Sequence, residues 1–181
     1  MTRFDDILSA RENVTKKIFS LIDFYKKPVI SITFNIPGPE KTNDMIFKAF
    51  EKVLQEINEI YKNKNCNMKL IERNIDDAGN RAFFIYLNAN GKENLMDAYI
   101  LKKMSVEIEE THTLGRLLDI DVYNINKKQI SRTEIGELTR KCFICSKEAR
   151  SCIILKRHSL KELNKKINFL LNKYISIGCQ N

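Results

Sequence analysis

The sequence predicts an α+β (or α/β) fold in which a mixed sheet is flanked by helices, with a helical C-terminal part. Short β-branched runs such as residues 29–34 alternate along the chain with segments whose apolar residues recur at the spacing of an amphipathic helix. The 181 residues suffice for one domain with a buried core. We expect residues 1–181 to form a single domain, with residues 132–181, a cysteine-containing loop and C-terminal helices, packed on it.

Lysine and arginine outnumber aspartate and glutamate, which gives the chain a net charge of +8. A charge of this size indicates an anionic partner, such as nucleic acid, a polyphosphate or an acidic protein. No apolar run approaches the roughly 20 residues that a membrane-spanning helix needs. The charged N-terminal segment does not have the pattern of a signal peptide. We therefore expect a cytoplasmic protein that does not enter a membrane.

The elements can be predicted in chain order from apolar spacing and turn residues. We expect helices over residues 4–26, 44–62, 92–103 and 160–174, and strands over residues 29–34, 68–75, 82–87 and 117–123. Residues 103–110 fit either a continuation of the third helix or a further strand, and the lack of glycine or proline there favours the helix. A helix would place Glu109 near His112, whereas a strand would place Glu107 and Glu109 on one side.

The turn after the first strand is a candidate anion site. Two prolines surround Gly38 and stiffen the turn. Asn43 or Thr42 can cap the helix that follows. Lys41 stands just before that helix N-terminus, where free N–H groups and the helix dipole favour negative charge. The alternative is a turn with a purely structural role.

Asp119 and Asp121 form the most informative polar motif of the chain. They alternate with Leu118, Ile120 and Val122, which is the pattern of a strand with one apolar face. Residues two apart in a strand point to the same side, so the two carboxylates are expected to project together. Adjacent carboxylates repel each other unless a cation lies between them, and Mg²⁺ is the common choice where phosphates are bound. The alternative is an exposed acidic strand face.

A second cluster consists of Cys142, Cys145, Cys152 and His158. Three thiols and one imidazole are enough for tetrahedral zinc, and the C-x₂-C spacing of the first pair is typical of such sites. Five cysteines in a chain without a signal peptide argue against a disulfide framework. Reduced buried thiols and a redox-active C-x-x-C pair remain as alternatives to zinc.

Several short motifs follow one another along most of the chain. They are Arg11-Glu12, Pro37-Gly38-Pro39 with Lys41, Glu107-Ile108-Glu109, His112, Leu114-Gly115-Arg116-Leu117, Asp119-Ile120-Asp121-Val122, Ser131-Arg132, Arg140-Lys141-Cys142, Cys145, Ala149, Cys152, Lys156 and His158. This set resembles the citrate lyase holo-acyl-carrier-protein synthase family, also called apo-citrate lyase phosphoribosyl-dephospho-CoA transferase. The chain departs from the family pattern at Val14, at Thr113 and over residues 75–83. At these places the family has an arginine, a proline and a Gly-Pro-Glu segment.

The resemblance implies a specific transferase activity. Phosphoribosyl-dephospho-CoA would pass from triphosphoribosyl-dephospho-CoA to a serine of the citrate lyase acyl carrier protein, the gamma subunit, with release of diphosphate. A triphosphate donor and an acidic carrier protein both suit a chain of this positive charge. The spacing Gly-x-x-x-Asp-x-Asp also resembles a compressed nucleotidyltransferase motif, which implies a distant nucleotidyltransferase-like fold by analogy.

The resemblance also implies roles for individual residues. The expected catalytic residues are Asp119, Asp121, Arg116, Glu109 and His112. The expected Mg²⁺ ligands are Asp119, Asp121 and Glu107. The expected substrate-binding residues are Gly38, Lys41, Gly115, Arg132, Arg140, Lys156 and His158. A solvated surface charge is the alternative for each of Lys41, Arg116, Arg132 and Arg140. Glu109 is expected to bind the metal or act as general base, and His112 to contact phosphate or serine.

Two other classes of function compete with this interpretation. The first is a basic nucleic-acid-binding module with a zinc knuckle, but the aromatic residues have core-like spacing and are not interleaved with the basic ones. The second is a non-catalytic adaptor of a metabolic complex. Metal-dependent release of diphosphate separates the transferase from both, and we expect no nucleic acid as partner.

Overall fold

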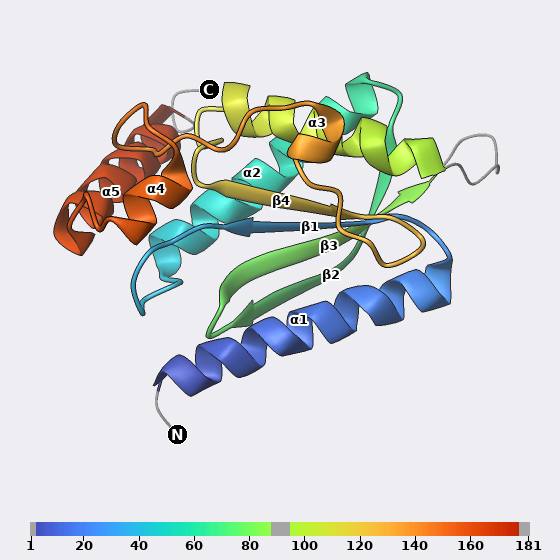
Figure 1. Ribbon diagram of the computed structural model, residues 1–181, viewed down its shortest axis with the longest axis horizontal. Coiled ribbons are helices and arrows are strands. Elements are labelled where there is room, and N and C mark those ends of the chain that lie inside the picture. The colour runs from blue at the N-terminus through green and yellow to red at the C-terminus, as the bar shows by residue number, and fades with distance from the viewer. Residues whose placement is uncertain (1–2, 88–94, 178–181) are drawn as a thin grey trace.

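The computed structural model describes residues 3–87 and 95–177, and Figure 1 shows them as a sheet with helices on both of its faces. In chain order the described elements are α1 (Arg3–Tyr25), β1 (Val29–Phe34), α2 (Asp44–Asn63), β2 (Asn67–Asp76), β3 (Gly79–Leu87), α3 (Leu95–Thr111), β4 (Leu118–Tyr123), the 3₁₀ helix η1 (Thr133–Ile135), α4 (Ala149–Ile154) and α5 (Leu160–Ile177). The predicted α+β class is confirmed. None of the described helices combines the length and the apolar composition of a membrane span.

The four strands lie in the order β2-β3-β1-β4, and each neighbouring pair is antiparallel. The prediction of a mixed sheet was therefore wrong. The alternation of helices and strands suggested parallel neighbours, but another strand lies between the two strands that each crossover helix connects. The β3 strand separates β1 from β2, and β1 separates β3 from β4. This is the split β-α-β-β-α-β arrangement of ferredoxin-like domains.

The helices cover the sheet from both sides (Figure 1). On one side, Ile18 and Ile22 of α1 pack on Val29, Phe83 and Ile85 of the sheet. On the other side, α2 and α3 pack on the opposite face and enclose the larger core. All six residues of β1 are buried because this central strand is covered on both faces. A polar side chain on the α1 side of β1 is therefore largely hidden from water, so its polar group needs a partner within the protein.

Residues 103–110 are helical, as the absence of helix breakers predicted, because α3 continues to Thr111. The first three residues of the predicted helix, 92–94, lie outside the described residues. In a helix, residues two apart point to nearly opposite sides. Glu109 accordingly faces the sheet and is buried, whereas Glu107 is exposed.

The stiff turn after β1 is held at both ends. Asn43 caps α2, since its side-chain oxygen accepts a hydrogen bond from the Ile46 N–H. Gly38 has a positive φ of 79°, and a Cβ atom there would lie 3.1 Å from a Leu160 methyl group. The turn therefore touches the start of α5, and glycine meets both a conformational and a steric requirement at this position.

The C-terminal segment returns to the main core through α5. Ile167, Leu171 and Tyr174 are buried in the same cluster as residues of α2, α3 and the sheet. In Figure 1, η1 lies beside α3, whereas α4 lies at the left with α5, near the C-terminal end of β1 and the start of β4. This placement brings the cysteine cluster close to the turn after β1.

Candidate functional site

Asp119 and Asp121 lie side by side on the face of β4 that points toward α1. In the antiparallel register they stand opposite Thr33 and Ser31 of β1. Burial and then the neighbouring charge of Asp119 raise the pKa of Asp121 from 3.8 to about 6. Gln129 Nε2 donates a hydrogen bond of 2.7 Å to Asp121 Oδ1. The shared face predicted from the sequence is present, and burial together with the charge of Asp119 disfavours the ionised form of Asp121.

A cavity of about 360 Å³ opens over this pair, and three cations line it. Arg11 comes from α1, Lys41 from the turn after β1 and Arg81 from β3. We call it the acidic cavity, defined by these three cations with Asp119 and Asp121. Each of the three cations comes from a different element, so only the folded chain brings them to the carboxylates.

Lys41 is placed by its own turn. Its Nζ donates to the carbonyl oxygen of Ile36 over 2.5 Å. Burial, and then the charge of Arg11, lower the pKa of Lys41. Among the described residues neither Lys41 nor Arg11 makes an ion pair. Two unpaired cations that repel each other inside a cavity are suited to binding an anion with several oxygens, such as a polyphosphate.

Arg81 was not singled out from the sequence. Its Nη1 donates to Ser31 Oγ over 2.7 Å, and burial lowers the pKa of its guanidinium, which Asp121 and Asp119 oppose. The predicted strand began at residue 82, whereas β3 begins at Gly79 and so includes Arg81. One arginine inside an otherwise apolar strand is the signal that could have identified it.

A second cavity of about 550 Å³ lies on the other side of the turn after β1. We call it the apolar cavity. The structure brings seven of the predicted site residues to its wall, namely Lys41, Arg116, Arg140, Lys156 and His158 with Cys142 and Cys152 of the cysteine cluster. The apolar part of its wall consists of Ile36, Pro37, Phe143, Ile153, Leu160 and Leu163. The two cavities share Asn35, Ile36 and Lys41, so they are neighbours separated by this turn.

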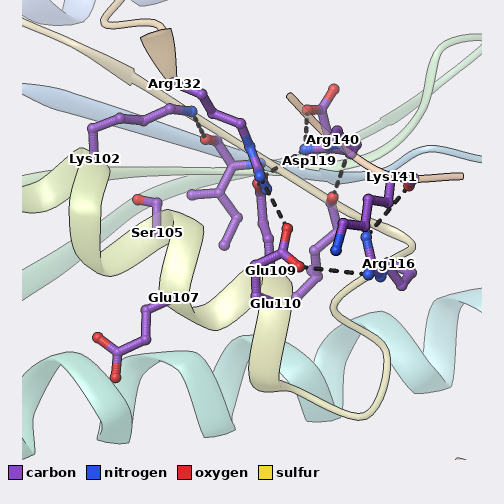
Figure 2. A network of polar contacts seen from close by, with 12 residues as sticks. Lys102, Ser105, Glu107, Glu109, Glu110, Arg116, Asp119, Arg132, Arg140 and Lys141 are labelled. Carbon is purple, nitrogen blue, oxygen red and sulfur yellow. Dashed lines mark hydrogen bonds and ion pairs between the residues drawn. The ribbon is translucent and has the colours of Figure 1, made fainter. Parts of the chain in front are cut away.

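Glu109 is the centre of a buried ionic network (Figure 2). It is 2% exposed, and its two oxygens lie 2.5 Å from Arg132 Nη2 and 2.7 Å from Arg140 Nη2. One oxygen also accepts the N–H of Ile120 in β4 over 2.8 Å. Arg140 continues the network to Asp119 over 3.0 Å. Both oxygens of Glu109 are thus occupied by protein partners, and Arg132 lines neither the acidic nor the apolar cavity.

Other predicted residues lie apart from the aspartates. Glu107 points away from Asp119 (Figure 2) and pairs with Lys64 after α2. His112 lies beyond the end of α3, where its Nε2 is 2.8 Å from Glu56 and its Nδ1 accepts the N–H of Leu114. The structure does not bring Glu107 or His112 together with the acidic pair.

Gly115 has a packing role. A Cβ atom at this position would lie 2.5 Å from the carbonyl oxygen of Glu109, at the end of α3. Such a contact cannot be relieved without moving backbone, so only glycine lets the chain turn closely from α3 into β4. The glycine thereby helps to set Asp119 and Asp121 relative to Glu109, and it lines neither cavity.

The predicted cysteine cluster is assembled in the structure. The ligand atoms of Cys142, Cys145, Cys152 and His158 all lie within 4.8 Å of one another. Cys145 Sγ is 3.5 Å from Cys152 Sγ and 3.4 Å from His158 Nε2. Tetrahedral zinc with Zn–S bonds of about 2.3 Å places neighbouring sulfurs ~3.8 Å apart. The cluster therefore has the ligands and the spacing to bind a metal ion such as zinc.

Comparison with known proteins gives a consistent result over nearly the whole chain. The family model described as apo-citrate lyase phosphoribosyl-dephospho-CoA transferase matches residues 2–174. A probable apo-citrate lyase phosphoribosyl-dephospho-CoA transferase of Streptococcus pyogenes serotype M18 is 31% identical over 178 residues, which cover 96% of this chain and 88% of the relative. One from Vibrio cholerae serotype O1 is 26% identical over 94% of this chain and 92% of the relative.

A longer relative matches as well. Protein CitXG of Leuconostoc mesenteroides subsp. cremoris is 31% identical over 167 residues, which cover 91% of this chain but only 33% of that protein. The present chain thus spans about a third of the longer relative. On the family model and on relatives of similar length, the chain belongs to the family of apo-citrate lyase phosphoribosyl-dephospho-CoA transferases, which transfer this prosthetic group to apo-citrate lyase.

Proposed function

We propose that this chain transfers phosphoribosyl-dephospho-CoA from its triphosphate precursor to a serine of the citrate lyase acyl carrier protein. The observation that carries the proposal is the acidic pair, Asp119 and Asp121, in a cavity lined by Arg11, Lys41 and Arg81. In the reaction, the serine hydroxyl loses its proton, its oxygen forms a bond to the phosphorus next to the ribose, and the bond from that phosphorus to diphosphate breaks. Catalysis of such a transfer depends mainly on positioning and on neutralising phosphate charge.

The donor set of the acidic pair fits Mg²⁺. Two carboxylates from one strand supply oxygen ligands, and a cation between them would offset the repulsion from Asp119 that, after burial, raises the pKa of Asp121. When bound, the ion would neutralise charge on the phosphate oxygens. Asp119 and Asp121 are the ligands in this proposal. Glu107 is left out because it pairs with Lys64 on another side of α3.

The three cations of the acidic cavity would bind the phosphates that leave. Arg11 and Arg81 can each hold two oxygens through parallel N–H groups, and Lys41 acts as a point charge. Arg140 bonds both Asp119 and Glu109, so it orients the acidic pair. We assign Glu109 and Arg132 to positioning, since Glu109 has both oxygens bonded. We assign His112 to structure, because Glu56 and Leu114 occupy its nitrogens.

We also propose that the cysteine cluster holds one structural zinc ion. Its four side chains come from the loop before α4, from α4 itself and from the residues just before α5. This segment has few regular elements, and a four-coordinate ion would fix it without a large apolar core. The nucleotidyltransferase-like relationship remains a hypothesis that rests on the Gly-x-x-x-Asp-x-Asp spacing alone.

The family assignment favours the transferase over the two alternatives, a nucleic-acid-binding module and a non-catalytic adaptor. The test uses the purified chain, Mg²⁺, the triphosphate donor and the apo carrier protein. We expect release of diphosphate and a carrier whose mass increases by one prosthetic group. Asp119→Asn should abolish both, whereas Asp77→Asn, an exposed acid in the β2–β3 turn, should leave them unchanged. Full turnover in Asp119→Asn would contradict the assignment of the acidic pair.

A further inference from the structure

The apolar cavity is the larger of the two cavities that meet at the turn after β1, and the transfer reaction as proposed above does not use it. Asn35, Ile36 and Lys41 line both cavities. On the far side of this shared wall, Arg140 of the apolar cavity lies 3.0 Å from Asp119 of the acidic cavity. The two cavities therefore adjoin, as the two parts of one extended ligand would require.

The two cavities differ in chemistry. Each cavity is lined by five charged side chains, but those of the acidic cavity include two carboxylates, whereas those of the apolar cavity are all cations and lie among apolar walls such as Phe143, Ile153 and Leu163. Its cations lie among these walls and include Lys141 and Lys156. Among the described residues, neither of these two lysine side chains makes an ion pair. A cavity of about 550 Å³ with apolar walls and free cations fits a ligand that combines a flat apolar group with phosphate.

Lys156 lies just after α4, in the wall of the apolar cavity. Lys156 has a positive φ of 44°, a conformation that favours glycine or asparagine just after a helix such as α4. Such a conformation is common where a helix ends. The side chain at this position lines the apolar cavity and is exposed, so the lysine does not serve the core.

We infer that the apolar cavity binds the dephospho-CoA part of the donor, with the adenine base against the apolar walls and the adjoining diphosphate at Lys141 and Lys156. This inference rests on the proposed function, because the donor is a dephospho-CoA that carries its reacting phosphates on an added ribose. The reacting end then lies in the acidic cavity, and the turn with Lys41 separates the two parts. Binding energy from the non-reacting part holds the reacting phosphorus in place.

Dephospho-CoA itself is the probe, because it lacks the phosphoribosyl triphosphate. We expect native protein to bind it in isothermal titration calorimetry. Lys156→Ala should raise its Kd roughly tenfold, as expected for one lost charge-assisted contact. Ala149→Phe should raise the Kd further, since Ala149 lines the cavity and the larger side chain would fill it. Lys165→Ala, an exposed lysine of α5 that lines neither cavity, is the charge-matched control and should leave the Kd unchanged.

A second probe separates the two cavities. Arg81→Ala should weaken binding of inorganic triphosphate and leave the Kd of dephospho-CoA unchanged, and Lys156→Ala should do the reverse. With the complete donor, Lys156→Ala should act mainly on KM. Circular dichroism at rising temperature confirms that each variant is folded, and Lys156→Ala remains informative if Ala149→Phe does not fold.

The outcomes distinguish this inference from the proposed function. An unchanged Kd for dephospho-CoA in Lys156→Ala and in folded Ala149→Phe, together with normal transfer by native protein, would overturn the inference alone. Binding of dephospho-CoA that depends on Lys156, in a native protein that never releases diphosphate, would support the cavity assignment and contradict the proposed transfer.

Discussion

At the scale of single residues, Asp121 has a carboxyl group whose surroundings disfavour its charge. Burial is the larger cause, and Asp119 on the same strand face is the second. Arg81 and Lys102 act in the opposite direction but do not compensate fully. The pKa of about 6 means that the charged form destabilises the folded state wherever the pH exceeds that value.

This shift predicts a stability difference that depends on pH. Between about pH 4 and pH 6 the folded state holds a proton on Asp121 that the unfolded state lacks, so stability falls as the pH rises through this window. Asp121→Asn mimics the protonated form, and without divalent cations it should therefore be more stable than native protein at pH 7. Urea unfolding at several pH values should show that the difference in unfolding free energy between Asp121→Asn and native protein shrinks as the pH falls from 7 to about 4. A difference that does not change with pH, or that equals the difference between Asp77→Asn and native protein, would contradict the raised pKa of Asp121.

At the scale of elements, α3 and the loop after β4 are joined through Glu109. The carboxylate connects α3 to the Ile120 N–H of β4 and to Arg132 and Arg140 of the loop. Because Arg140 also bonds the Leu118 carbonyl oxygen and Asp119, the loop is held against the strand that bears the acidic pair. The position of the pair thus depends on one buried acid from a different element.

Glu109→Gln should strongly destabilise the protein. The substitution leaves two largely buried guanidinium groups without their main counter-charge, and loss of one partner of such a network costs on the order of 3 kcal/mol. Glu107→Gln on the same helix is the matched control, because its pair with Lys64 is exposed and should contribute less than about 1 kcal/mol. Chemical unfolding of both variants tests this, and equal small losses would show that the network is not stabilising.

The cysteine cluster also joins separate segments, namely the loop before α4, α4 itself and the residues just before α5. We expect close to one zinc ion per chain in protein purified without chelator, and a lower Tm once a chelator has removed it. Cys152→Ala should lose the zinc. Cys66→Ala should keep it, since Cys66 is buried elsewhere beside Met104. Native protein with almost no zinc and a Tm indifferent to chelator would leave the four side chains as packing residues.

At the scale of the whole molecule, the net charge of +8 acts on both substrates. Three cations gather in the acidic cavity and others in the apolar one, so part of this charge is concentrated where an anionic donor would bind. The rest is spread over exposed helix faces such as that of α5. Long-range attraction to an acidic carrier protein follows from the total charge and is screened by salt.

Transfer to the carrier protein should therefore slow as ionic strength rises. We expect kcat/KM for the carrier to fall roughly tenfold between about 50 mM and 500 mM NaCl, because electrostatic steering acts mainly on association. The Tm over the same range is the control and should change little. A kcat/KM that does not respond to salt would mean that charge has no part in carrier recognition.

The sequence by itself determined the elements and the family. Helix and strand periods are local properties, so α1, α2, α3, the four strands and α5 could all be predicted within a few residues. The period of two likewise placed Asp119 and Asp121 on one face before any tertiary contact was known. Motif order over most of the chain identified the family, which the match over residues 2–174 confirms.

Only the tertiary structure decided how distant elements meet. The sheet is antiparallel because β3 and β1 lie between the strands that the crossover helices connect, which no local pattern records. Arg81 joins the acidic pair because β1 lies between β3 and β4 and places their side chains on one face. Because α3 packs on β4, the carboxylate of Glu109 pairs with two arginines, and these partners cannot be read from its place in the sequence. Local spacing sets which way a side chain points, but the packing of elements sets what it meets.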